Sequence, residues 1–369
     1  MISFAQPYFN EQTLKKILSR FQQVLESGRL TNGRCVREVE SLFAELLNGR
    51  GVVATNSCTA SLHLSMILAG ITPRDEVIVP SNTFVSTANA VLYCNAKPVF
   101  AEIDPSTLNI DPEDVLNRIT EKTRAIVPVH LCGKPCEMDH LMEIAEEHNL
   151  TVIEDCAHAL GSKYKNQPCG TFGQFACFSF YPTKVIASAE GGLLVSNDKD
   201  AITLGRVLIN QGRTGTGPNE ITEVGYNYRM NELQAAVILE QLPELDGFVK
   251  TRNEIAKHYT ERLADTDNIS LVVETPQERS SFYAYAIRIL DISRDAVRQQ
   301  LLKHGIETSI MYNPVHLQPV YRKLYGYEQG SLPITEKTCS QIINLPMHVG
   351  LSLEEVDYVC DTLKNAVKL

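Results

Sequence analysis

The sequence predicts an α/β protein with two domains: a large domain whose mostly parallel sheet lies between helices, and a smaller C-terminal α+β domain. Short apolar runs separated by polar turns and helical patterns recur over residues 52–197, which is typical of strand–helix–strand units. After about Asn268 this repetition stops, and one alternating segment and two capped helices follow. The 369 residues also exceed the length that one hydrophobic core usually supports. We place the boundary between residues 1–248 and 249–369.

Six apolar runs of the first domain are predicted to be strands, namely EVIVP, KPVFAEID, RAIVPVH, LTVIED, FACFSF and GGLLVSND. Between the third and the fourth, apolar residues recur at helical spacing in EMDHLMEIAEEHN, which predicts a strand–helix–strand unit. Such units assemble into a largely parallel sheet, whose ligands bind at the carboxyl ends of the strands. Residues that directly follow a predicted strand are therefore the first candidates for a site.

The remaining predicted elements mark the passage to the second domain. MNELQAAVILEQLPEL predicts a helix that ends near Pro243, and VKTRNEIAKHYTERL predicts a longer helix that leaves the first domain. SFYAYAIRIL alternates in polarity, as expected of a half-exposed strand. SRDAVRQQLLKHG predicts a helix with Ser293 at its start and Gly305 at its end, and SLEEVDYVCDTL opens with a capping box from Ser352 to Glu355.

The composition is that of an ordinary globular protein and argues against several classes of function. A formal net charge of −10 is unsuited to general binding of nucleic acid or of an anionic membrane. No apolar run approaches the roughly 18 residues of a spanning helix, so we expect no membrane association and a cytoplasmic location. The ten cysteines are scattered and are expected to be reduced thiols. Cys132 and Cys136 come closest to a metal-binding spacing, but we predict no metal site.

Three residues could carry chemistry near the predicted strand ends. Lys184 lies in FSFYPTKVIASAEGG, between an apolar run and a Gly-Gly pair, where burial of an unpaired ammonium would favour loss of its proton. Asp155 closes the strand LTVIED, which places its carboxylate at the ligand edge of the sheet; the alternative is a helix cap. His158 follows three residues later and could equally be a satisfied structural group.

The stretch ATNSCTASLHLSMILAG begins with the small polar residues Asn56, Ser57 and Thr59 and continues as an apolar helix. Free N–H groups at such a helix start suit a phosphate, although simple capping of a buried helix is the alternative. Phe84 follows another strand end and could line a cofactor site or belong to the core. There is no P-loop, no G-x-G-x-x-G after the first strand and no G-x-S-x-G, which argues against nucleotide hydrolysis, nicotinamide chemistry and serine hydrolysis.

Taken together, the motifs resemble the nucleotide-sugar aminotransferases of the DegT/StrS type, which are fold-type I enzymes dependent on pyridoxal phosphate (PLP). The resemblance runs over nearly the whole chain, through TNSCTASLHLSM, VIVPSNTFVSTANAVLY, AKPVFAEIDP, PVHLCGKPCEMDHL, VIEDCAHALGS, GQFACFSFYPTK, AEGGLLVSND, VGYNYRMNELQAA and VHLQPVY. It implies a large PLP-binding domain followed by a small C-terminal domain.

The resemblance also implies roles for the three candidates at the strand ends. Lys184 would form the internal aldimine with PLP and, once released, would move the proton between the substrate carbon and the cofactor carbon. Asp155 would keep the pyridine nitrogen protonated, so that the ring can accept the electrons of the broken C–H bond. His158 stands where many members have glutamine, near the ring oxygen of the cofactor.

Further cofactor contacts follow from the same resemblance. Phe84 matches the aromatic residue that stacks on the PLP ring. Thr59, Ala60 and Ser179 match the residues that hold the phosphate, the first two at the predicted helix start and the third through its hydroxyl. Cys58 replaces the glycine common in this motif, a departure that leaves the N–H donors in place.

Other matching positions concern the partner subunit and the sugar. Asn227 in GYNYRM resembles the asparagine that reaches the phosphate from the neighbouring subunit, which implies a homodimer with shared active sites. Tyr312 and His316 in YNPVHLQPVY resemble a segment near the sugar in some relatives. Both substrate assignments depend on the resemblance alone.

The resemblance implies transamination from an amino acid, glutamate by family habit, to a keto-sugar, most often a keto-deoxysugar linked to a nucleoside diphosphate. The product would be an amino sugar for a surface polysaccharide or a glycosylated metabolite. One alternative is a PLP-dependent sugar dehydratase, although in such relatives histidine replaces the lysine found here at Lys184. The other is a non-catalytic PLP-binding regulatory protein. Arg29, Arg34 and Arg213 could meet the diphosphate or be solvated surface residues.

Overall fold

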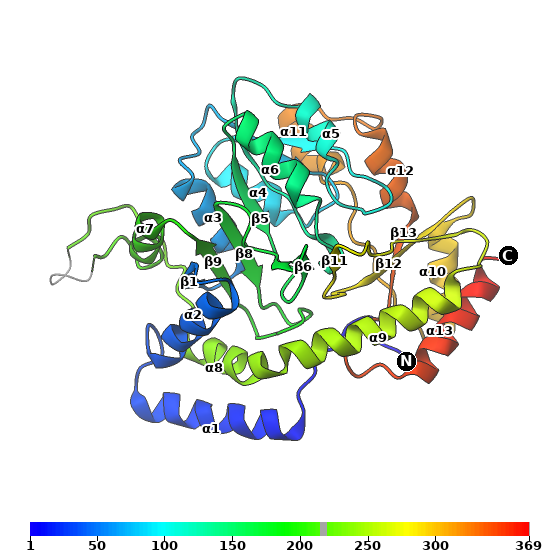
Figure 1. Ribbon diagram of the computed structural model, residues 1–369, viewed down its shortest axis with the longest axis horizontal. Coiled ribbons are helices and arrows are strands. Elements are labelled where there is room, and N and C mark those ends of the chain that lie inside the picture. The colour runs from blue at the N-terminus through cyan, green and yellow to red at the C-terminus, as the bar shows by residue number, and fades with distance from the viewer. Residues whose placement is uncertain (215–219, 369) are drawn as a thin grey trace.

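The computed structural model describes residues 1–214 and 220–368, which are built around a seven-stranded sheet (Figure 1). The strand order is β1-β9-β8-β5-β4-β2-β3. β9 runs antiparallel to both of its neighbours, and the other neighbouring strands are parallel. The strands are β1 (Gly51–Thr55), β2 (Glu76–Pro80), β3 (Lys97–Ala101), β4 (Thr123–Ile126), β5 (Thr151–Asp155), β8 (Phe175–Ser179) and β9 (Gly192–Ser196).

Helices cover both faces of this sheet, which explains why its strands read as continuous apolar runs. Successive side chains alternate between the faces: Phe178 and Leu193 pack with α2 and α8, whereas Cys177 and Leu194 pack with α3, α4 and α7. α5 and α6 extend the first layer over β4 and β5. The helices are α1 (Glu11–Ser27), α2 (Arg34–Leu46), α3 (Cys58–Leu68), α4 (Ser86–Tyr93), α5 (Pro112–Asn117), α6 (Met138–Glu147), α7 (Lys199–Ile209), α8 (Glu232–Gln241) and α9 (Leu245–Leu263).

The six strands predicted in the first domain are confirmed as β2, β3, β4, β5, β8 and β9, and the predicted helix between β4 and β5 is α6. The prediction missed β1, the edge strand that pairs with β9. The predicted helix around Pro243 is confirmed as α8, but the chain continues through one 3₁₀ turn, Leu242–Glu244, directly into α9.

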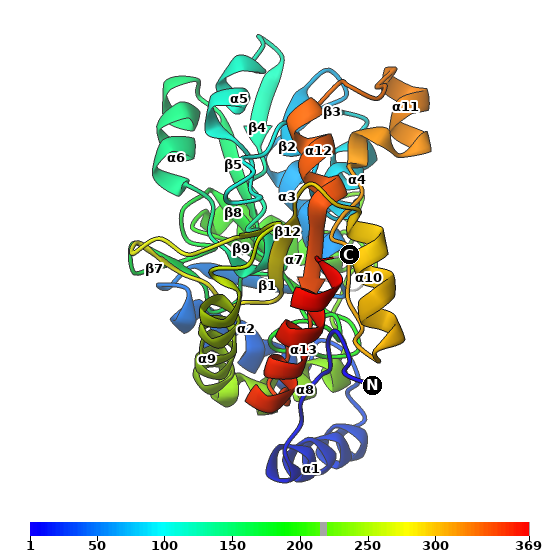
Figure 2. The same ribbon diagram turned by 90° about the vertical axis from the view of Figure 1, so that its right-hand side faces the viewer.

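The C-terminal part forms a three-stranded antiparallel sheet, ordered β10-β12-β13, that packs with α10, α13 and the second half of α9 (Figure 2). The expectation of a half-exposed strand is wrong for β12, because this central strand is covered on both faces. Ile287 packs into the core formed with α9 and α13, and Ala286 packs into a separate core under the loop that follows β4. The elements are β10 (Ile269–Leu271), β12 (Tyr285–Ile289), β13 (Ile342–Leu345), α10 (Arg294–Lys303), α11 (Pro319–Tyr325), α12 (Pro333–Gln341) and α13 (Leu353–Ala366).

The predicted starts of α10 and α13 are confirmed. The side chain of Ser293 accepts a hydrogen bond from the N–H of Ala296, and Ser352 and Glu355 form the expected capping box. We propose that the domain boundary at residues 248 and 249 lies within α9, because Phe248 packs into the core of the large sheet and Ile255 into that of the small sheet.

The two parts of the chain are nevertheless interwoven. β11 (Glu278–Arg279) pairs with β6 (Lys163–Tyr164), which in turn pairs with β7 (Gln167–Pro168). Tyr321 of α11 packs against Phe100 of β3, so a C-terminal segment returns to the large sheet. All ten cysteines are free thiols, as expected. Among the helices of the described residues, none is both long enough and apolar enough to cross a membrane.

Candidate active site

A cavity of about 410 Å³ lies at the carboxyl ends of β5 and β8, between the large sheet and the segment that precedes β12. This is the edge of the sheet at which ligands were expected. The cavity brings together most of the residues predicted to form the site, which are Thr59, Phe84, Asp155, His158, Ser179, Lys184 and Tyr312.

Asp155 ends β5 with its carboxylate buried in the wall of the cavity. The hydroxyl of Thr87 donates to it at 2.8 Å, and the N–H of Ala157 donates at 3.1 Å. Burial raises the pKa of Asp155, although these two hydrogen bonds oppose the rise. No Lys, Arg or His nitrogen of the described residues lies within 4.0 Å of this carboxylate. A buried carboxylate without a cation suits a ligand that brings its own positive charge.

Lys184 lies in the turn that follows β8, where its N–H donates to the carbonyl of Tyr181 at 2.9 Å. Its Nζ faces the ring of Tyr283 at 4.4 Å from the centroid, and no carboxylate of the described chain lies within 4.0 Å. Desolvation lowers the pKa of Lys184 to about 8, against weaker opposing effects of Cys58, Asp155 and Cys132. A neutral, nucleophilic amine is therefore accessible near neutral pH.

The ring of His158 is held in one tautomer. Its Nδ1 accepts a hydrogen bond from the backbone N–H of Cys132 at 3.3 Å, so the proton of the neutral ring must lie on Nε2. Nε2 lies 3.4 Å from the hydroxyl of Tyr312, inside the cavity. Desolvation lowers the pKa of His158 well below its ordinary value, with the charge of Lys184 as a second cause. His158 is thus a neutral hydrogen-bond donor.

The start of α3 forms one wall of the cavity. Ser57 caps the helix by accepting a hydrogen bond from the N–H of Ala60 at 3.2 Å. Ala60 does not itself line the cavity, and its contact with a phosphate stays a prediction. The N–H groups of Cys58 and Thr59 belong to the first turn of α3, where no carbonyl of the helix can accept their hydrogen bonds. They are therefore available to bind a ligand. Cys58 takes helical geometry as the first residue of α3, so the replacement of glycine leaves these donors in place.

The Gly-Gly pair that follows Lys184 allows β9 to approach this helix start. A Cβ atom on Gly192 would lie 2.4 Å from the carbonyl carbon of Ser57 and 2.5 Å from the nitrogen of Cys58. Only glycine fits at such a distance from another backbone. The second glycine of the pair thus fixes the position of the helix start relative to the strand.

Several aromatic side chains line the cavity, among them Phe84, Tyr181 and Tyr312. The ring of Phe84 lies 5.8 Å from that of Tyr312, measured between centroids, with an angle of 54° between the planes. Phe84 is 55% exposed and Tyr181 is 50% exposed. Large exposed aromatic residues beside a cavity are typical of a surface that a ligand or a partner covers.

Besides Ala60, two further predicted site residues do not line this cavity. His316 is 0% exposed, and its ring nitrogens lie 2.6 Å from the Ser81 hydroxyl and 3.1 Å from the Glu336 carboxylate. The prediction of a substrate contact at His316 is therefore wrong for this structure. Asn227 is exposed and does not line the cavity of its own chain; its carbonyl accepts a hydrogen bond from Asn56 at 3.4 Å.

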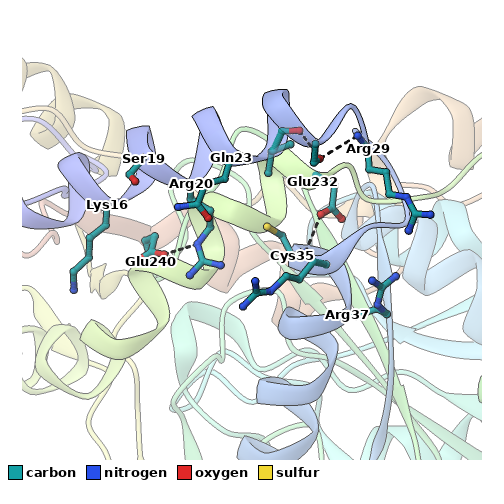
Figure 3. Close-up of a pocket in the computed structure, with 12 residues that line it drawn as sticks. Lys16, Ser19, Arg20, Gln23, Arg29, Cys35, Arg37, Glu232 and Glu240 are labelled. Carbon is teal, nitrogen blue, oxygen red and sulfur yellow. Dashed lines mark hydrogen bonds and ion pairs between the residues drawn. The ribbon is translucent and has the colours of Figure 1, made fainter.

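A second cavity, of about 470 Å³, lies between α1, α2 and α8 and contains Arg29 and Arg34 (Figure 3). Arg29 and Arg37 lie at one end of it, beyond Cys35. Arg20 is neutralised by Glu240 at 2.5 Å. The other basic residues that line this cavity are Lys16, Arg29, Arg34 and Arg37.

The third predicted arginine, Arg213, is exposed and lines neither cavity. Arg213 belongs to the loop NQGRTGTGPNE. Residues 215–219 of that loop lie outside the described residues.

The sequence did not reveal Tyr283, whose ring lines the cavity opposite Lys184. Tyr283 belongs to SFYAYAIRIL, which was interpreted only as a strand. It precedes β12 and meets a lysine about a hundred positions away in the chain. No local pattern marks such a contact, because its formation depends on how the two parts of the chain pack.

Comparisons with known proteins identify the family of the chain. The model of the DegT/DnrJ/EryC1/StrS aminotransferase family matches residues 11–364. GDP-perosamine synthase of Caulobacter vibrioides is 38% identical over 335 residues, which cover 90% of each chain. DesV of S. venezuelae, solved with a ketimine intermediate, superposes with a TM-score of 0.93 and 32% identity over 100% of both chains. Spr1654 of Streptococcus pneumoniae, solved in its PLP form, gives a TM-score of 0.94 and 29% identity, covering 100% of this chain and 98% of that one.

The residues present fit PLP. Among the described residues, no cation lies within 4.0 Å of the buried Asp155 carboxylate and no carboxylate within 4.0 Å of the Lys184 amine. The first group suits a protonated pyridine nitrogen and the second an aldehyde. The free N–H groups at the start of α3 suit a phosphate. The chain belongs to the DegT/DnrJ/EryC1/StrS aminotransferase family, and it is a PLP-dependent sugar aminotransferase of fold type I.

Proposed function

We propose that Lys184 and Asp155 are the catalytic residues of this aminotransferase. The observation that carries the proposal is that both line one cavity and that neither has an opposite charge within 4.0 Å among the described residues. PLP, when bound, supplies a carbonyl carbon that combines with amines and a ring that accepts electrons from the substrate. Lys184 holds the cofactor through its amine and, when that amine is free, moves a proton at the reacting carbon. Asp155 keeps the ring nitrogen protonated.

The remaining contacts hold the cofactor in place. We assign the N–H groups of Cys58 and Thr59 and the hydroxyl of Ser179 to the phosphate, because they meet at the wall of the cavity formed by α3 and the end of β8. Phe84 covers one face of the ring. His158 donates from Nε2 to the ring oxygen, where a glutamine amide would donate in many relatives.

We further propose that the working unit is a homodimer and that Asn227 of the partner subunit completes the phosphate site. Asn227 is exposed and does not reach the cavity of its own chain. Large apolar residues close to it in the sequence are also exposed, with Val224 at 89% and Ile221 at 54%. A surface of this kind is typical of an interface.

The substrates that we propose are glutamate as the amino donor and a keto-deoxysugar linked to a nucleoside diphosphate as the acceptor. The name of the Caulobacter relative, GDP-perosamine synthase, supports a nucleotide-linked product. Tyr312 lines the cavity beside Phe84 and is proposed to contact the sugar. We place the reaction in the cytoplasm, which is supported by the ten free thiols.

The visible spectrum of the purified protein tests the roles of Lys184 and of the donor. We expect PLP to give a visible absorption band that glutamate discharges, and Lys184→Ala to lack that band. Lys199→Ala is the matched control, because Lys199 is an exposed lysine of α7. A band that persists in Lys184→Ala would overturn the assignment of the lysine. A band that other amino acids discharge, but not glutamate, would overturn only the assignment of the donor.

A further inference from the structure

Tyr283 brings an aromatic ring from the C-terminal part of the chain into the cavity of Lys184. Its side chain is buried two residues before β12. The ring stacks on the imidazole of His158, with 4.0 Å between centroids and an angle of 19° between the planes. The Nζ of Lys184 lies 4.4 Å from the centroid of the same ring. One ring therefore contacts a group proposed to bind the cofactor and faces the amine proposed to react.

Further contacts fix the position of this ring. The hydroxyl of Tyr283 is hydrogen-bonded to that of Thr183 at 2.9 Å, and Thr183 directly precedes the lysine in the chain. Arg252 of α9 donates to the carbonyls of Phe282 and Tyr283 at 3.0 and 3.3 Å. The ring is thus held through its hydroxyl, through its backbone and by stacking.

We propose that Tyr283 is a positioning residue for amino transfer, whose ring holds the Lys184 amine in the cavity and stabilises its charged form through a cation–π contact. This inference rests on the proposed role of Lys184 as the lysine that moves the proton. Such a lysine must take up a proton and return it, so both of its protonation states must be accessible. Burial disfavours the charged state. An aromatic face attracts a cation, and does so most strongly where water is excluded, so the ring opposes the effect of burial.

The test measures the pKa of the Lys184 amine in the full-length protein freed of cofactor. The rate at which acetic anhydride modifies Lys184 is followed against pH by mass spectrometry of the peptide, with the exposed Lys199 as an internal standard. Tyr283→Phe keeps the ring and removes the hydroxyl, whereas Tyr283→Leu removes the ring. Tyr285→Leu is the matched control, because Tyr285 is also buried but stacks on Tyr259 at 4.8 Å.

We expect Tyr283→Leu to lower the pKa of Lys184 by about one unit, since removal of the ring removes an attraction to the charged form. Tyr283→Phe and Tyr285→Leu should leave this pKa unchanged. A rise of the pKa in Tyr283→Leu would mean that the ring acts by excluding water. An equal fall in Tyr285→Leu would mean that general loss of packing is responsible. Either result would overturn the proposal.

Circular dichroism establishes that each variant is folded. If Tyr283→Leu is not, Tyr283→Met takes its place, because methionine fills an irregular space without offering an aromatic face. The proposed function is tested by a different measurement, the visible spectrum of Lys184→Ala with PLP, in which Tyr283 is unchanged. An unchanged pKa in the folded Leu or Met variant would refute the role of the ring and leave the catalytic lysine untouched.

Discussion

The hydroxyl of Thr87 donates a hydrogen bond of 2.8 Å to the buried carboxylate of Asp155. Thr87 belongs to the first turn of α4, and Asp155 ends β5, so the bond ties a helix start to the edge of the sheet. The hydroxyl of Thr83 lies 2.8 Å from that of Thr87 and can donate to it, which leaves the Thr87 proton for the carboxylate. These bonds orient the carboxylate and favour its charged form, against the burial that raises its pKa.

Thr87→Val should slow the reaction more than it weakens cofactor binding. Valine keeps the shape of threonine but removes the donor, so the pKa of Asp155 should rise and the ring nitrogen should lose part of its partner's charge. Loss of a hydrogen bond to a charged group corresponds to about a tenfold fall in kcat. Steady-state kinetics and a PLP titration measure the two effects. Thr87→Ser retains the hydroxyl and should stay within about threefold of the wild-type kcat; a Ser variant as slow as the Val variant would contradict the role of the bond.

Attachment of PLP to the cofactor-free protein should depend on the pKa of Lys184. The neutral amine is the nucleophile, and desolvation lowers its pKa from 10.5 to about 8. The rate, followed by visible absorbance after mixing, should rise about tenfold per pH unit below that value and level off above it. A rate that continues to climb past pH 9 would show that the amine is solvated like an ordinary surface lysine.

His158 should show no ionisation in the range in which histidine usually titrates. Its pKa is lowered by burial, and its Nδ1 is occupied by the N–H of Cys132. Nitrogen NMR of the ring should therefore show the neutral tautomer protonated at Nε2 between pH 6 and pH 8. A shift of the ring signals within this range would contradict the burial argument.

Replacement of His158 tests its role as a donor. His158→Gln supplies an amide N–H and should bind PLP within about threefold of wild type, whereas His158→Leu, which has no donor, should bind about tenfold more weakly. Equilibrium titration with PLP gives both values. Equal weakening in the two variants would mean that the shape of the ring, rather than its N–H, is required.

Much of the site could be predicted because its residues follow local patterns. Asp155 is the last residue of an apolar strand, and Lys184 precedes a glycine pair whose second member, Gly192, closely approaches another backbone segment. In a parallel sheet the carboxyl ends of the strands lie at one edge. Residues predicted separately at the ends of different strands therefore lie close together in the structure. The fold could be predicted for the same reason, since six of the strands were recognisable in the sequence as separate apolar runs.

Contacts between distant segments could not be predicted in this way. Tyr283 reaches Lys184 only because the segment before β12 packs over the large sheet. His316 has a side chain that could bind a substrate, but its two ring nitrogens contact Ser81 and Glu336, which come from other parts of the chain. The exposure of β12 was misjudged for a related reason: alternation along a strand does not show whether a second core covers its outer face.

Gly192→Ala should destabilise the protein and weaken PLP binding together. The added Cβ would lie 2.4 Å from the carbonyl carbon of Ser57, and neither backbone can turn aside as a flexible side chain would. Forcing an extra carbon into a packed site costs about 1–3 kcal/mol, and the start of α3 must shift away from β9, which moves the N–H groups of Cys58 and Thr59. Urea denaturation and a PLP titration measure the two losses.

Gly247→Ala is the matched control for this variant. Gly247 lies in α9, and nothing lies within 4 Å of the Cβ position. Alanine in a helix interior is favoured over glycine by about 0.5–1 kcal/mol, so this variant should be slightly more stable than wild type and should bind PLP normally. If Gly192→Ala lost stability but kept wild-type affinity for PLP, the start of α3 would not hold the phosphate, and the assignment of Cys58 and Thr59 would fall while that of Lys184 remained.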